Sequence, residues 1–128
     1  MKIEISPIKY QIEIDGYGSF DVSPLGAGAE ADIRIAYREM GEAVDATKKF
    51  EGIVEREKNG EKMDKDSEEY KACMEAFSEA SKVVDKVRET VLSKMRAVFK
   101  GKNVEKLFQD FTFDQILDIH NKATKSGK

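Results

Sequence analysis

The sequence predicts an α+β fold that is mainly α, with an N-terminal β-hairpin, a long antiparallel helical hairpin and two short C-terminal helices. Three observations lead to this class. Apolar and polar residues alternate near the N-terminus, apolar residues then recur at spacings of three and four, and no glycine or proline interrupts the later helical pattern before Gly101. A chain of 128 residues fits a single domain. We divide it into a β-hairpin region (1–24), a helical hairpin (25–100), C-terminal helices (101–124) and a tail (125–128).

The N-terminal segment has the alternation of a hairpin with one buried face. The apolar positions are Ile8, Tyr10, Ile12, Ile14, Phe20 and Val22. Asp15-Gly16 predicts the turn, because glycine accepts a positive φ without steric cost. Ile3 and Ile5 before Pro7 are candidates for a short edge strand. A lone hairpin is only marginally stable, so we expect it to pack on helices or to pair with a strand of another subunit.

A first helix is predicted from about Ala29 to Lys58. Its apolar positions are Ile33, Tyr37, Met40, Val44, Phe50 and Val54. Gly41 and Gly52 weaken it, each by about 1 kcal/mol relative to alanine. Asn59-Gly60 is a predicted stop, followed by a charged connector.

A second helix is predicted from residue 67 to residue 100, with Asp66 or Ser67 as its cap and with Asp66 and Glu69 as a capping box. Tyr70, Phe77, Val84, Val91 and Val98 recur every seven residues along it, and the turns between them carry Met74, Ala80, Val87 and Met95. Such a helix would be about 50 Å long. It would have to bend around a core, or project and find a partner.

Two shorter helices complete the predicted fold. The first carries Val104, Leu107, Phe108 and Phe111. Thr112 and Gln115 predict a capping box that opens the second, which carries Ile116, Leu117 and Ile119 and ends in a polar tail from Lys122 onward.

Gly26-Ala27-Gly28-Ala29-Glu30-Ala31 matches the G-x-G-x-x-A pattern of a nucleotide-binding loop. That pattern binds phosphate only directly between a buried parallel strand and a helix. Here a half-polar hairpin arm precedes it, and Ser23 and Pro24 intervene as a predicted cap and first helical residue. We therefore expect a junction of small residues that lets the chain change direction between sheet and helix.

Other candidate sites have simpler interpretations. His120 is the only histidine, which excludes a histidine-rich metal site, and we expect it at the surface or the edge of the core. Cys73 is the only cysteine, which excludes an intrachain disulfide and favours a small buried hydrophobe in a reducing compartment. An acidic group lacks the EF-hand spacing and is expected to be a solvated helix start: Asp64, Asp66, Glu68 and Glu69. We expect no enzyme activity, no metal and no cofactor.

Charge and hydropathy indicate a soluble protein of the cytoplasm. The net charge is −3, and no apolar run is long enough for a signal peptide or a membrane span. Nucleic-acid binding is therefore not favoured, although basic residues predominate from Lys94 to the end. A small regulator or nucleic-acid binder that uses this basic end remains an alternative.

The apolar seams are the candidate interaction surface. A homo-oligomer is expected, and the positions proposed for oligomer or client contact are Ile33, Tyr37, Met40, Val44, Tyr70, Phe77, Val84, Val91 and Met95. The sequence leaves open the oligomeric state and whether the hairpin pairs within or between chains.

The run from Ile12 to Gly26, IEIDGYGSFDVSPLG, and the closing run from Phe111 to Leu117, FTFDQIL, resemble small tail-module proteins of long-tailed bacteriophages. Among these the chain is most similar to tail assembly chaperones. The resemblance implies a non-enzymatic protein, made in the cytoplasm of the infected host, that binds the helical tape measure protein and recruits tail-tube (major tail protein) subunits. A structural component of the tail or virion is the alternative that the same resemblance allows.

Overall fold

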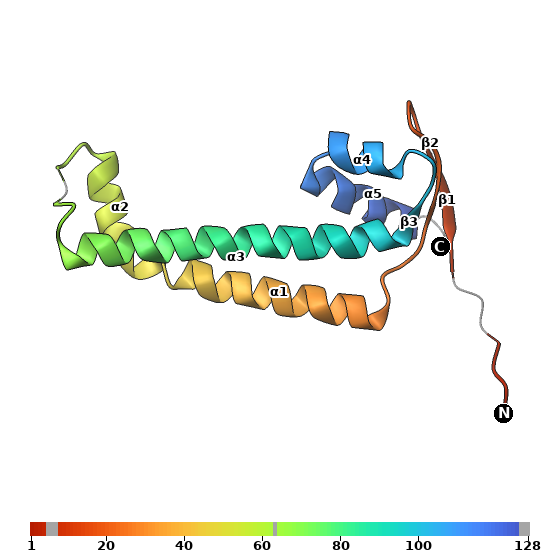
Figure 1. Cartoon of the computed structure of the whole chain (residues 1–128), viewed down its shortest axis with the longest axis horizontal. Helices are drawn as coiled ribbons and strands as arrows, with labels where there is room; N and C mark the ends of the chain where they lie inside the picture. Colours follow the sequence, from red (N-terminus) through yellow and green to blue (C-terminus); the bar gives the residue numbers. More distant parts are fainter. Residues whose placement is uncertain (5–7, 63, 126–128) are drawn as a thin grey trace. The chain divides into compact units, whose positions relative to one another are not determined.

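A computed structural model describes residues 1–4, 8–62 and 64–125. The strands are β1 (Tyr10–Ile14), β2 (Gly18–Val22) and β3 (Phe99–Lys100). The helices are α1 (Ala27–Asp45), the 3₁₀ turn η1 (Lys48–Phe50), α2 (Glu51–Lys58), α3 (Glu68–Val98), α4 (Val104–Asp110) and α5 (Phe113–Lys125) (Figure 1). The predicted class, α+β and mainly α with an N-terminal hairpin, is confirmed.

The chain forms two compact units. The first unit comprises Met1–Glu30 and Thr90–Lys128, and the second comprises Ala31–Glu89. The first therefore contains the strands, α4, α5, the first residues of α1 and the last turns of α3, whereas the second contains the rest of α1, η1, α2 and the rest of α3.

The first unit is built on an antiparallel sheet in the order β1-β2-β3. Tyr10 pairs with Val22 and Ile12 with Phe20, so the apolar residues of both hairpin arms lie on one face, as predicted. The turn also falls where the sequence places it: the Tyr17 N–H donates to the Ile14 carbonyl at 2.9 Å, and Gly16 has a φ of 84°. The predicted edge strand around Ile3 is not formed at residues 1–4, and Ile5 and Pro7 lie outside the described residues.

The core of the first unit lies on the apolar face of this sheet. Helix α5 contacts β1 and β2. The largest fully buried side chains of the unit are Phe20, Val22, Val91, Phe99, Leu107 and Ile116. The predicted capping box of α5 is present, since the Thr112 N–H donates to Gln115 Oε1 at 2.9 Å and the Gln115 N–H to Thr112 Oγ1 at 3.2 Å.

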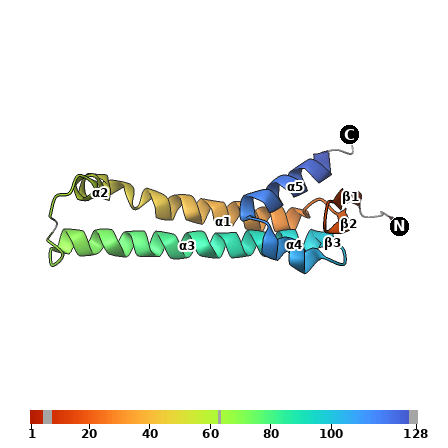
Figure 2. The same ribbon diagram turned by 90° about the horizontal axis from the view of Figure 1, so that it is seen from above.

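In the second unit, residues 31–45 of α1 run antiparallel beside residues 68–89 of α3, as both views show (Figures 1 and 2). Beyond α1, η1 and α2 pack on the start of α3 through Phe50, Ile53 and Cys73, with exposed fractions of 7%, 4% and 3%. Helix α2 ends in a Schellman motif at the predicted stop: Gly60 has a φ of 82°, its N–H donates to the Glu57 carbonyl, and the Glu61 N–H donates to the Arg56 carbonyl.

The predicted first helix is wrong in its continuity and its start. Helix α1 ends at Asp45, and a turn at residues 46–47 with η1 separates it from α2. The Thr47 hydroxyl donates to the Val44 carbonyl at 2.7 Å and so competes with helical hydrogen bonding at the break. At the other end, Ser23 and Pro24 are not helical, and α1 begins at Ala27.

The predicted second helix is confirmed at its cap, for which Ser67 was one of two candidates, and wrong at its end. Ser67 caps α3, because its Oγ accepts the Tyr70 N–H at 3.1 Å. The hydrogen bonds of the described residues include none between Asp66 and Glu69, so the alternative capping box is not seen there. The helix stops at Val98 instead of residue 100. The cause is tertiary: Phe99 pairs with Val22 in the sheet and is fully buried.

Candidate functional site

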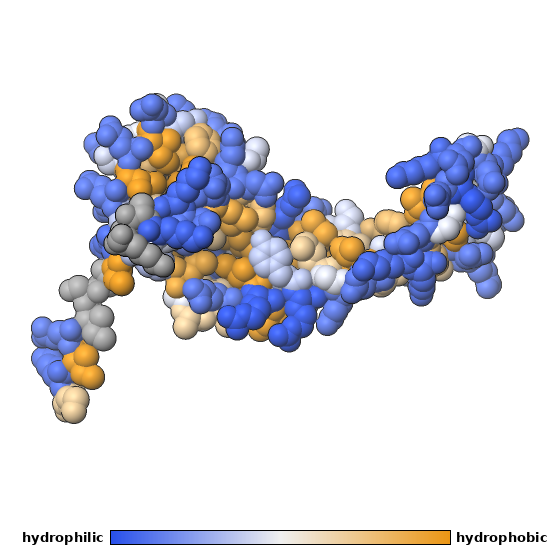
Figure 3. Space-filling model, turned by 180° about the vertical axis from the view of Figure 1, so that it is seen from behind, coloured by the Kyte–Doolittle hydropathy of each residue, from blue (hydrophilic) through white to orange (hydrophobic). Residues whose placement is uncertain are grey.

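The candidate interaction surface lies on the helices of the second unit, where large apolar side chains remain exposed. On α1, Tyr37 is 38% exposed and Val44 43%, and the two lie seven residues apart on one flank. On α3, Met74 is 49% exposed and Phe77 38%, three residues apart. Figure 3 shows hydrophobic surface between charged residues along these helices. We call these four residues the apolar flanks.

The structure separates the nine predicted contact residues into three groups. Tyr37, Val44 and Phe77 are exposed. Four more are half-buried in the second unit: Ile33, Met40, Tyr70 and Val84. Val91 and Met95 belong to the first unit and are only 1% and 6% exposed, so they are core residues and not part of a surface that a client could reach.

The buried line of α3 is the second of the two predicted lines, with Cys73 in place of Met74. Cys73, Ala80 and Val87 are buried at intervals of seven, whereas Phe77 lies at the margin. Ala80 and Val87 lie on a predicted line and are buried, whereas Met74, predicted on the same line, is 49% exposed. Cys73 stands seven residues before Ala80, and this spacing was the signal that could have placed Cys73 on the line instead of Met74.

Ile35 was not among the predicted contacts, yet it is 49% exposed on the other flank of α1. Its position between Arg34 and Ala36 breaks the spacing of three and four that marked the seam. An apolar residue outside the predicted buried stripe was therefore the signal in the sequence that Ile35 is exposed.

A shallow groove adjoins Phe77 in the second unit. It has a volume of about 470 Å³ and is lined by Thr47, Glu51, Val54, Glu55, Lys58 and Phe77. Its floor is apolar at Val54 and Phe77, and its rim carries both signs of charge. Such a groove fits an apolar side chain of an amphipathic helix whose own flanks are charged.

Beneath this region, Cys73 is the small buried hydrophobe that the sequence predicts. Burial raises the pKa of its thiol above the usual value, and the carboxylates of Glu57 and Glu69 raise it further. A raised pKa disfavours the thiolate, which is the reactive form of cysteine. The environment of Cys73 is therefore that of a structural residue.

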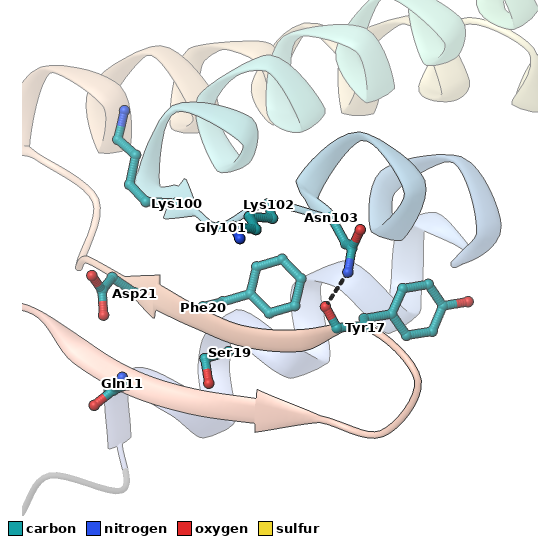
Figure 4. A pocket seen from close by; sticks show the side chains of 9 residues that line it. All are labelled: Gln11, Tyr17, Ser19, Phe20, Asp21, Lys100, Gly101, Lys102 and Asn103. Carbon is teal, nitrogen blue, oxygen red and sulfur yellow. Dashed lines mark hydrogen bonds between the residues drawn. The ribbon is translucent and has the colours of Figure 1, made fainter.

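A hollow of about 460 Å³ lies in the first unit between β2, β3 and the start of α4 (Figure 4). The Phe20 ring lies against Gly101, while Lys100 and Asp21 extend away from the ring (Figure 4). None of the described lining residues places a buried polar side chain in this hollow. It therefore has the character of a packing junction.

Tyr17 fastens the hairpin turn to α4 at the rim of this hollow. Its carbonyl accepts the Asn103 side-chain amide at 2.7 Å, and its hydroxyl donates to Asp110 Oδ2 at 2.9 Å. The ring meets Phe111 edge-on with centroids 5.2 Å apart, and Lys106 Nζ lies 5.4 Å from its centroid. The hydrogen bond to Asp110 is the main cause that raises the pKa of Tyr17 above 10.0.

His120 lies at the edge of the core, one of the two places the sequence allows. Its side chain is 8% exposed, and Nε2 lies 3.0 Å from the Ser23 carbonyl oxygen. A carbonyl only accepts, so this nitrogen carries the proton of the hydrogen bond. The ring also stacks on Phe99, with centroids 6.1 Å apart. His120 thus ties α5 to the segment between β2 and α1.

The G-x-G-x-x-A segment does not have the crowding of a nucleotide loop. A Cβ added at Gly26 or Gly28 would meet no atom within 4 Å among the described residues, and neither glycine has a positive φ. Neither crowding nor a positive φ therefore requires glycine here, and the segment lies at the junction between β2 and α1, where the sequence places it. The Gly26 carbonyl accepts the Glu30 N–H at 2.9 Å and so starts α1.

In the part of the chain that the structure describes, no three His, Cys, Asp or Glu side chains are grouped as metal ligands. None of its helices there combines the length and apolar character needed to span a bilayer. Comparisons of the chain with protein-family models, with curated proteins and with solved structures found no match.

Proposed function

We propose that this chain is a non-enzymatic chaperone of phage tail assembly, which binds the long helical tape measure protein and tail-tube subunits in the host cytoplasm. The observation that carries the proposal is the set of exposed apolar residues on the second unit, Met74 and Phe77 above all. The resemblance of residues 12–26 and 111–117 to small tail-module proteins supplies the identity of the client.

The chemistry of this surface supports a helical client. Met74 offers a flexible, polarizable side chain that adapts to different partners, and Phe77 offers a rigid ring beside the groove at Val54. Glu51, Glu55 and Lys58 at the groove rim can pair with charges beside the client's apolar stripe. A client helix would enter with residues spaced at three and four.

Co-expression with the tape measure protein tests the proposal. The wild-type chain should co-purify with the client and keep it soluble. Met74→Glu and Phe77→Glu should each weaken the complex by roughly tenfold or more, because each places a charge where an apolar contact would form. Lys82→Glu is the matched control, since it introduces the same side chain at an exposed position of the same helix.

Two results would overturn the proposal. One is the absence of any complex with the wild-type chain. The other is a complex that forms equally well with both glutamate variants, which would remove this surface as the client site.

A chaperone leaves the assembled tail, whereas a structural component stays. Mass spectrometry of purified particles therefore separates the two. Finding the chain in finished particles at a fixed ratio to the tube protein would assign it to the tail structure instead.

A further inference from the structure

The sheet of the first unit ends at β1. Strand β2 is central, and β1 pairs with it on one side only. Among the described residues, the backbone of residues 10–13 makes no hydrogen bond beyond the β1–β2 ladder, and outside that ladder the Ile14 carbonyl accepts only the Tyr17 N–H of the turn. An edge strand of this kind presents unpaired N–H and C=O groups to another strand.

The apolar face is also incompletely covered at this edge. Phe20 and Val22 on β2 are 1% and 0% exposed, whereas their cross-strand partners Ile12 and Tyr10 on β1 are only half-buried. A hollow of about 320 Å³ opens beside β1, lined by Ile12, Glu13, Ile14, Ile119, Lys122 and Ala123. The core of the first unit therefore continues to an edge where apolar side chains meet solvent.

We propose that β1 pairs antiparallel with β1 of a second copy of this chain, centred on Ile12. This register pairs all five residues of β1 with one another. The facing pairs are Ile12 with Ile12, Tyr10 with Ile14, Gln11 with Glu13, and Lys9 with Asp15 of the second copy. Residues directly opposite one another share a face, so the apolar face continues from one copy to the next.

The charges select this register over its neighbours. Lys9 faces Asp15 twice in each dimer, and the Gln11 amide can donate to the Glu13 carboxylate. A slip that centres the pair on Glu13 puts two carboxylates opposite each other and pairs only three residues of each strand. A slip that centres the strand pair on Gln11 also pairs only three residues of each β1 strand. The result of the favoured register is one six-stranded sheet in which Ile12 and Ile14 are covered.

A cysteine scan along β1 reads the register directly. In a Cys73→Ala background, Ile12→Cys should form a disulfide-linked dimer under mild oxidation, since opposite Cα atoms lie about 4.5–5.5 Å apart. Gln11→Cys or Glu13→Cys alone should form no disulfide-linked dimer. Each cysteine would lie diagonally from the same cysteine of the second copy, at about 7–8 Å. Mixing these two variants should link them to each other. Ser19→Cys on β2 is the negative control.

Charge reversal is the second measurement and leaves the backbone unchanged. Lys9→Glu should shift the dimer towards monomer in sedimentation, because it faces the Asp15 carboxylate, and the double variant K9E/D15K should restore the dimer. Lys102→Glu makes the same change of charge as Lys9→Glu, but at a residue that follows β3, and it should leave the monomer–dimer equilibrium unchanged. Circular dichroism would verify that each variant is folded.

The proposal is overturned if the wild-type chain is a monomer at all concentrations, or if Gln11→Cys or Glu13→Cys links to itself instead of Ile12→Cys. It is independent of the proposed function, because the apolar flanks lie in the other unit. A dimer without client binding would contradict only the chaperone proposal. Client binding by a monomer would contradict only the strand pairing.

Discussion

At the scale of single residues, the backbone of Gly101 packs directly on β2. A Cβ built on Gly101 would lie 2.6 Å from Phe20 Cδ1 and 2.8 Å from the Ser19 carbonyl oxygen. Neither neighbour can yield easily, since Phe20 is 1% exposed and Ser19 belongs to the sheet. The absence of a side chain is therefore what allows the chain to leave β3 towards α4.

Gly101→Ala should lower the free energy of unfolding by about 1–3 kcal/mol, the usual cost of overpacking. Gly52→Ala is the matched control, because a Cβ there meets nothing within 4 Å and the position is helical. That control should raise stability by about 0.4–1 kcal/mol. Urea unfolding of both variants is the measurement. Equal stability of Gly101→Ala and wild type would show that the contact is relieved without cost.

Tyr17 gives a second prediction, concerning pH. The hydrogen bond to Asp110 raises its pKa in the folded state, so folding favours the protonated phenol. This contribution is present below pH 10.0 and is lost as the pH rises through the higher folded pKa. Asp110→Asn should bring the pKa of Tyr17 back towards its usual value. Ultraviolet titration of the tyrosinate band would measure this, and an unchanged titration would refute the role of Asp110.

At the scale of elements, local signals predict a helix end where the hydrogen bonds that make it are local. Thr112 and Gln115 predict a reciprocal cap that forms, and Asn59-Gly60 predicts a stop that forms, because these hydrogen bonds are made within a few residues. At the start of α3 two caps were possible. Ser67 is used, and its hydroxyl also donates to the Asp64 carbonyl at 2.9 Å.

Ser67→Ala should therefore destabilise the second unit by about 0.5–2 kcal/mol, the range for loss of a helix cap. Asp66→Ala, one residue earlier, should change stability by less than about 0.5 kcal/mol, since its side chain does not cap the helix. Thermal unfolding of the pair is a direct comparison. If Asp66→Ala lost more stability than Ser67→Ala, Asp66 and not Ser67 would be the residue that caps the helix.

At the scale of the whole molecule, two compact units share one covalent chain and one continuous helix. Helix α3 contributes residues up to Glu89 to the second unit and those from Thr90 to the first. Each unit has its own core, built around Phe20, Phe99 and Leu107 in the first and around Phe50, Ile53 and Cys73 in the second. Separate cores allow separate local opening.

Hydrogen exchange should report this separation. Gly101→Ala should speed exchange in β2, β3 and α4 and leave α2 at the wild-type rate, because α2 packs within the second unit. Ile53→Ala should do the reverse, since Ile53 is 4% exposed in the second core. Equal loss of protection in both units from either variant would mean that they open together.

The sequence by itself determined the hairpin, its turn and its apolar face, and the helical character of most of the chain, because alternation, helical spacing and capping residues act over a few positions. Only the tertiary structure decided that Phe99 leaves the helix for the sheet, that Thr47 marks a break, and that Val91 and Met95 are buried while Met74 and Phe77 are exposed. These outcomes depend on partners distant in sequence, since burial of a fully apolar side chain outweighs a small helix preference. The candidate surface was therefore predicted only in part: the helices that carry it were found, and the face left open was set by the packing of Cys73, Ala80 and Val87.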